Sequence, residues 1–127
     1  KFVSLLRRTA AHDRDKARKD DETLVRHVYD LHLIMQTNPN MGEIKSLVDK
    51  VIQIDIKHFG NQNEWFVKDP VSELKYGLAI LLDSPKHALR YEQFINPLVY
   101  HKSPASWNEA IASVEKAAKI WLGGCFD

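Results

Sequence analysis

An arginine and an aspartate four positions apart, Arg26 and Asp30, are the residues whose types and spacing could do chemistry. They belong to the segment LVRHVYDLHLI, in which Leu24, Val28 and Leu31 recur at the spacing of one buried helical face. Positions four apart are neighbours on a helix, so the guanidinium and the carboxylate are close enough to pair. A carboxylate beside a buried helical face either pairs with another polar group or has a functional role. The spacing leaves both roles open: an ion pair, or a site in which Asp30 acts on a substrate that Arg26 orients or binds.

The other reactive groups form no recognisable site in the sequence. The six histidines include no HExxH or HxxxH motif and have no cysteine at ligand spacing, so we expect no zinc site. Asp13 and Asp15 lie in a charged segment with no strand before them, and we do not expect them to bind a metal. The single cysteine, Cys125, has no activating base nearby in the sequence. The sequence also contains no P-loop and no GxGxxG motif.

Helical patterns cover almost the whole chain, and no segment predicts a strand. We therefore expect an all-α fold, a single compact helical domain over residues 1–127 with five to six helices. Capping residues place four of the helix starts: Asn40 with Glu43, Asp69 before Pro70, Ser84 before Pro85, and Ser106 with Glu109. The first helix is expected to end near Ala11 and the second to run from Thr23 to about Gln36.

Three further expectations concern which residues are buried. The third helix should bury one stripe, made of Ile44, Leu47, Val48 and Val51. Residues 60–69 should form an irregular loop whose Trp65 and Phe66 fold back onto the core. Arg7, Arg8 and the charged segment from His12 to Glu22 should be solvated.

Composition limits the class of protein. With 127 residues, 44% hydrophobic and 28% charged, the chain is long enough and apolar enough to fold around one core. A net charge of +1 argues against a dedicated nucleic-acid surface. One cysteine excludes a disulfide framework and favours the cytoplasm, and no apolar run is long enough to span a membrane.

Two blocks of the sequence carry a resemblance to a known family. The chain opens with KFVSLLRR, in which a lysine precedes an apolar helix, and a polar insert then leads to an R-x-x-x-D-L helix. This arrangement resembles the C-terminal half of the AbiEii/AbiGii toxin nucleotidyltransferase family. The resemblance covers Lys1 to about Ile34 and continues more loosely through YEQFINPLVY and SWNEAIASVEKAAKIW.

The resemblance implies a nucleotide-transfer site. Lys1 and Asp30 would be catalytic, with Lys1 contacting nucleotide phosphates, and Arg26 would bind substrate. The full-length protein would use Mg²⁺ and a nucleoside triphosphate, modify an RNA acceptor such as tRNA, and be controlled by an antitoxin in a toxin–antitoxin or abortive-infection system. The family's Gly-Ser loop does not occur in this sequence, and its metal-binding Asp-x-Asp pair has no convincing counterpart. We therefore expect the metal-binding half in a missing N-terminal domain, and no nucleotide transfer by this chain alone.

A different class of function is also compatible with the sequence. The chain could be a non-catalytic helical protein-interaction module that shares only the helix pattern. Trp65 with Phe66 and the segment from His12 to Glu22 would then be its contact surfaces.

Overall fold

The computed structural model describes residues 2–15, 22–59, 64–95 and 105–123, and every regular element within these ranges is a helix. The predicted all-α class is therefore confirmed. The elements are α1 (Phe2–Arg14), a 3₁₀ turn η1 (Glu22–Val25), α2 (Arg26–Gln36), α3 (Met41–Phe59), α4 (Glu64–Lys68), α5 (Pro70–Leu82), α6 (Pro85–Ile95) and α7 (Trp107–Trp121).

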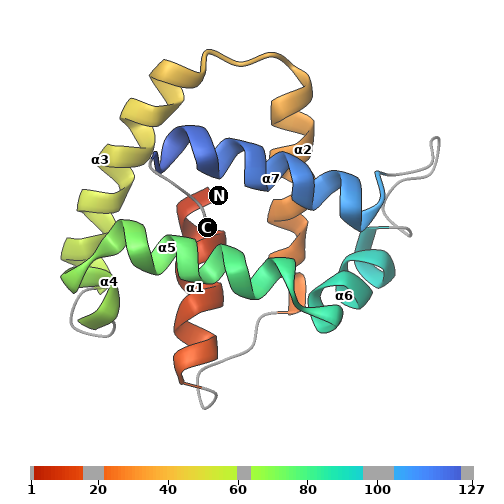
Figure 1. Cartoon of the computed structure of the whole chain (residues 1–127), viewed down its shortest axis with the longest axis horizontal. Helices are drawn as coiled ribbons and strands as arrows, with labels where there is room; N and C mark the ends of the chain where they lie inside the picture. The colour runs from red at the N-terminus through yellow and green to blue at the C-terminus, as the bar shows by residue number, and fades with distance from the viewer. Residues whose placement is uncertain (1, 16–21, 60–63, 96–104, 124–127) are drawn as a thin grey trace.

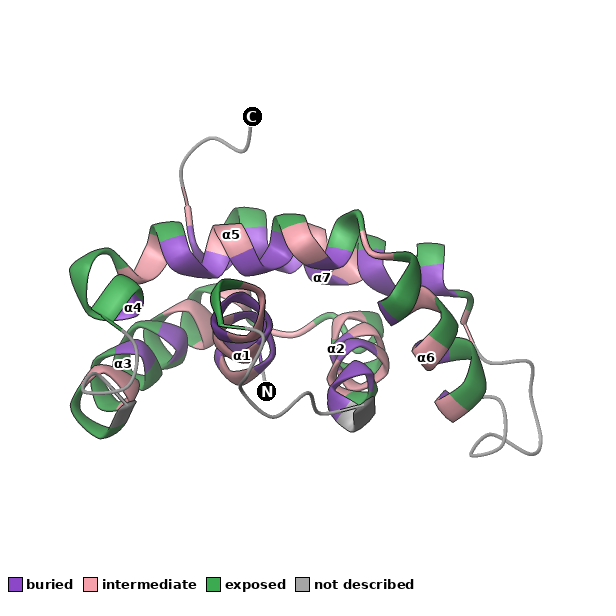
Figure 2. Ribbon diagram, turned by 90° about the horizontal axis from the view of Figure 1, so that it is seen from below, coloured by how far each residue is buried: buried purple, intermediate pink, exposed green. Residues whose placement is uncertain are grey.

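The longer helices are arranged in two layers. Figure 1 shows α5 and α7 crossing over α1, α2 and α3, and Figure 2 shows the buried faces of the two layers turned toward each other. The closest pairings between the layers are α1 with α5 and α2 with α7. The largest fully buried side chains include Trp121, Tyr91, Phe66, Leu74 and Leu78. No helix in the described ranges combines the length and the apolar character needed to cross a membrane.

Local capping chemistry fixes where four helices begin, as the sequence predicts. Side-chain oxygens of Asn40, Asp69, Ser84 and Ser106 each accept a hydrogen bond from the backbone N–H three residues later, at 3.1–3.3 Å. These bonds satisfy amides that have no partner within the first helical turn. Hydrogen bonds from the backbone and the side chain of Ser72 also lower the pKa of Asp69.

Buried aromatic rings hold α6 against α2 and α7. The ring of Tyr91 lies 6.5 Å from that of Tyr29 and 5.5 Å from that of Trp107, in edge-to-face arrangements. The Tyr91 hydroxyl donates to the carbonyl oxygen of Ala105 at 2.7 Å, and burial raises the pKa of Tyr91 to about 12. These contacts fix α2, which forms one wall of the groove described below.

The helix boundaries differ from the predictions in three places. The described residues contain seven α-helices rather than five to six, because residues 64–68 form the short helix α4 instead of an irregular loop. Its Phe66 is fully buried, as predicted, whereas Trp65, also predicted to fold back onto the core, is 49% exposed. Helix α1 continues to Arg14, past Ala11, and α2 begins at Arg26 after a 3₁₀ turn.

The burial predictions fail for α1 and α3. The Arg7 side chain is only 13% exposed, and its Nε donates to Oδ2 of Asp55 on α3 at 3.2 Å, so it is not solvated. On α3 the buried residues are Val48 and Ile52, whereas Leu47 and Val51 are exposed. The prediction that Leu47 and Val51 belong to the core is therefore wrong.

Candidate functional site

The exposed residues of α3 border an apolar groove between α2 and α3. Its volume is about 230 Å³. Every residue that lines it is apolar: Phe2, Val3, Leu31, Ile34, Ile44, Leu47, Val48, Val51 and Trp121. Four helices contribute, with α2 and α3 as walls and the start of α1 and the end of α7 as the floor. Figure 1 shows α2 and α3 as the two arms of an arch at this place.

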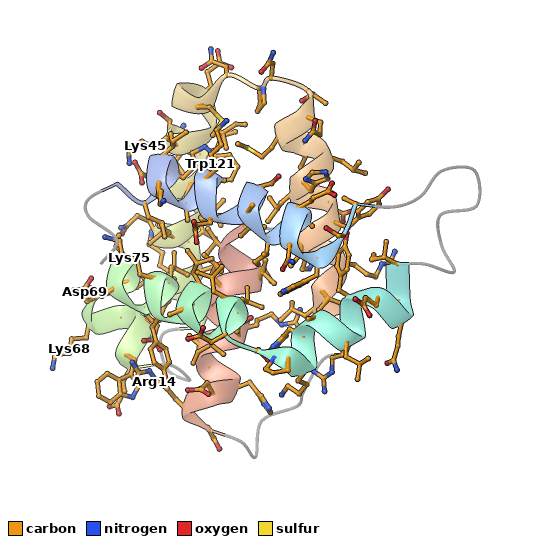
Figure 3. All side chains as sticks on the ribbon, turned by 45° about the vertical axis from the view of Figure 1, so that its right-hand side comes forward. Arg14, Lys45, Lys68, Asp69, Lys75 and Trp121 are labelled. Atoms are coloured by element: carbon orange, nitrogen blue, oxygen red, sulfur yellow. The ribbon has the colours of Figure 1, made fainter. Side chains whose placement is uncertain are left out.

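Two contacts fix the floor and one wall of the groove. The rings of Phe2 and Trp121 meet edge to face, with centroids 4.9 Å apart and planes at 89°. Lys45 of α3 donates from Nζ to the carbonyl oxygen of Trp121 at 3.2 Å, and Figure 3 shows the two residues together at the end of α7. A lysine is favoured there because the last carbonyls of a helix lack partners and carry partial negative charge. The groove is thus held in shape before anything binds.

The rim of the groove exposes large apolar side chains. Ile34 is 37% exposed, Leu47 58% and Val51 40%. One turn further along α3, Ile54 is 52% exposed and extends the same stripe. Single exposed apolar residues are common, but a contiguous patch around a concave surface is typical of a binding site. This patch is the strongest indication of function in the described residues.

A cluster of charged and aromatic residues joins α1, α4 and α5 at a separate place. Arg14 donates from Nε and Nη2 to the carboxylate of Glu73 at 2.8–3.0 Å. Its guanidinium carbon lies 4.1 Å from the ring centroid of Trp65 and 4.2 Å from that of Tyr76. The hydrogen bond to Glu73 raises the pKa of Arg14, and the Tyr76 hydroxyl donates to Asp13, which raises the pKa of Tyr76. These groups satisfy one another, so we interpret the cluster as a structural clasp.

The structure describes two of the three predicted site residues. Arg26 and Asp30 lie one turn apart on α2, as expected, and Lys1 lies outside the described residues. Arg26 is exposed, with its guanidinium carbon 5.8 Å from the ring centroid of Phe94, and Asp30 is half-buried. Their proposed roles in nucleotide transfer stay predictions.

The described residues can be searched for metal ligands and for the predicted contact surfaces. Across the described ranges, no group of three or more histidine, cysteine, aspartate or glutamate side chains could hold a metal ion. Cys125 lies outside those ranges, as do residues 16–21 of the charged segment. Of the predicted Trp65–Phe66 contact surface, Phe66 is buried, whereas Trp65 is 49% exposed and lies against the guanidinium of Arg14.

Comparisons with known proteins give no match, whether with models of protein families, with curated proteins or with solved structures. Function is therefore inferred from the groove and from the residues around it.

Proposed function

We propose that this chain is a helical protein-binding domain whose groove between α2 and α3 receives the apolar face of a partner helix. The observation that carries the proposal is the ring of half-exposed Ile34, Leu47 and Val51 around a preformed apolar groove. Burying what remains exposed of such a side chain contributes on the order of 1 kcal/mol. Several such residues around one groove provide a driving force that an isolated exposed leucine lacks.

The length of the apolar stripe favours a helix over a small ligand. Ile44, Leu47, Val51 and Ile54 follow the 3-4-3 spacing of one helical edge. At 1.5 Å per residue they extend about 15 Å, and Ile54 lies beyond the residues that line the groove. Amphipathic helices bind grooves through anchors at this same spacing.

The test uses a model peptide with leucine at positions a and d of three heptads, titrated into the ¹⁵N-labelled chain. We expect chemical-shift changes at the amides of Leu31, Val48 and Val51. Leu47→Glu should weaken binding at least tenfold, because it places a carboxylate where the peptide must exclude water. Leu89→Glu is the matched control, since Leu89 on α6 is 56% exposed and does not line the groove.

Both substitutions are at exposed positions, so we expect the free energy of unfolding to change by no more than about 0.5 kcal/mol. Peptide binding that is absent, or equal in the wild type and Leu47→Glu, would contradict the proposal.

A second candidate is the nucleotide-transfer role implied by the AbiEii/AbiGii resemblance. It is favoured by the placement of a half-buried Asp30 one turn after an exposed Arg26. Mg²⁺ with ATP, titrated into the labelled chain, should then shift the amides near Arg26 and Asp30. Asp30→Asn should remove those shifts, while Asp83→Asn on the exposed end of α5 should not. An unchanged spectrum at saturating nucleotide would mean that Arg26 and Asp30 do not bind the nucleotide without the metal-binding half.

A further inference from the structure

Helix α3 carries a heptad pattern on its exposed side. With Ile44 as position a, Leu47 is d, Val51 is a and Ile54 is d. The buried Val48 is position e of this register. Helix α3 therefore has two adjacent apolar faces, one packed on its own fold and one that begins at the half-buried Ile44 and is exposed at Leu47, Val51 and Ile54.

We infer that the occupant of the groove is α3 of a second copy of this chain, paired in parallel about a two-fold axis. The inference rests on the proposed function and names its partner. The residue types support it, because β-branched residues at a with leucine at d favour parallel two-stranded pairs. Both a positions here, Ile44 and Val51, are β-branched, and one of the two d positions is Leu47.

The sides of α3 determine the orientation. Position e, occupied by Val48 and Asp55, faces the rest of the fold, where Val48 is buried and Asp55 accepts from Arg7. Position g, occupied by Glu43, Lys50 and Lys57, is exposed. In an antiparallel pair e faces e, which would bring both folded bodies to the same side of the two helices, where they would compete for space. In a parallel pair e faces g, so the bodies lie on opposite sides.

Charge complementarity agrees with the parallel arrangement. Position g of one helix lies opposite position e of the next heptad in its partner, which places Lys50 opposite the partner's Asp55. The two-fold axis repeats this pair, giving two attractive contacts beside the seam. Asp55 already accepts from Arg7 at 3.2 Å and 15% of its side chain is exposed, so the partner's Lys50 would contact its exposed edge as a second cation.

The size of the contact between the two α3 helices determines how tightly the dimer is expected to bind. Stable complexes typically bury roughly 1,200 Å² or more in total, and a seam of four apolar residues is short for such a contact. We therefore expect a dimer with a dissociation constant on the order of micromolar, formed and broken with concentration. Pairing through α3 would cover Leu47, Val51 and Ile54 together.

Sedimentation equilibrium of the whole chain, over roughly 1 to 500 μM, tests the inference. The wild type and Leu89→Glu should dimerise, and Leu47→Glu should remain monomeric. Lys50→Glu should weaken the dimer at least fivefold, because it places a glutamate opposite the partner's Asp55. Glu43→Lys separates the orientations: it should change little in a parallel pair, but in an antiparallel pair Glu43 lies beside Lys57 of the partner and its reversal would weaken binding.

Each outcome decides between the two proposals. A chain that is monomeric throughout but binds the heptad peptide would overturn self-pairing and leave the groove as a site for another protein. A chain that does neither would overturn both. A dimer that persists in Leu47→Glu, or that responds to Glu43→Lys and not to Lys50→Glu, would overturn the parallel α3 pairing.

Discussion

Gly77→Ala is expected to destabilise the fold by about 3 kcal/mol or more, the upper range for inserting a methyl group into a packed interior. Gly77 lies on α5 where this helix crosses α1. A Cβ atom at this position would overlap the backbone carbonyl oxygen of Leu6 and lie 3.0 Å from its carbonyl carbon. A backbone cannot turn aside as a flexible side chain can, so the two helices would have to separate.

The predicted loss of stability is opposite in sign to the helix propensities of alanine and glycine. Alanine is favoured over glycine inside a helix by about 1 kcal/mol, so a loss can come only from the crossing. Gly42→Ala is the control, because its Cβ would lie 3.6 Å from Oδ1 of Asn40, an ordinary contact. Urea unfolding followed by circular dichroism should show Gly77→Ala strongly destabilised and Gly42→Ala unchanged or slightly stabilised. Equal stability of the two variants would mean that α1 and α5 are not in close contact at Gly77.

The crossing at Gly77 matters for the groove as well as for stability. Helix α1 carries Phe2 and Val3 into the groove floor, and its position is set mainly by α5. A partly destabilised Gly77→Ala protein should therefore also lose affinity for the heptad peptide. The effect would be indirect, through displacement of the floor.

Helix starts and most buried stripes could be predicted because their causes are local. A capping oxygen at Ser106 and the N–H of Glu109 are three residues apart, so the sequence contains both partners. The stripe of α7 from Trp107 to Trp121 is likewise a property of one helix, and its apolar residues are buried. The all-α class follows from such local patterns.

The groove could not be predicted in the same way, because burial depends on which neighbours a helix acquires. Helix α3 has apolar residues on two adjacent faces, and the sequence does not say which face the core covers. The predicted stripe contained Val48, which the fold covers, but also Leu47 and Val51, which stay exposed while Ile52 is buried. The number of apolar residues in α3 is the signal that was available in the sequence. A helix with more apolar residues than one buried face requires has a second apolar surface.

The clasp around Arg14 was also beyond local patterns, since Arg14 and Glu73 are 59 positions apart in the sequence. Both residues look like ordinary surface charges in a polar context. The packing of α1 against α5 leaves the Glu73 side chain 3% exposed and places the Arg14 guanidinium against it.

Arg14→Met is expected to cost about 1–3 kcal/mol, because Glu73 is buried but Arg14 is 28% exposed, so water replaces part of the lost interaction. The variant keeps much of the apolar length of the side chain but leaves the carboxylate of Glu73 buried without its guanidinium. It also removes the cation that lies over the rings of Trp65 and Tyr76. Lys119→Met is the matched control, because Lys119 and Glu115 are 57% and 39% exposed and such a pair contributes less than about 1 kcal/mol.

The double variant Arg14→Met with Glu73→Leu distinguishes an unpaired charge from lost packing. If the cost of Arg14→Met comes from the stranded carboxylate, removing Glu73 as well should recover most of the stability, since a buried pair replaced by apolar residues is often neutral. If the cost comes from the contacts with Trp65 and Tyr76, the double variant should be as unstable as the single one. Hydrogen exchange gives an independent check, because α4 is only five residues long and is held beside Arg14 through Trp65. Loss of amide protection in α4 alone, with the global unfolding free energy unchanged, would show that the clasp orders α4 locally and does not support the whole fold.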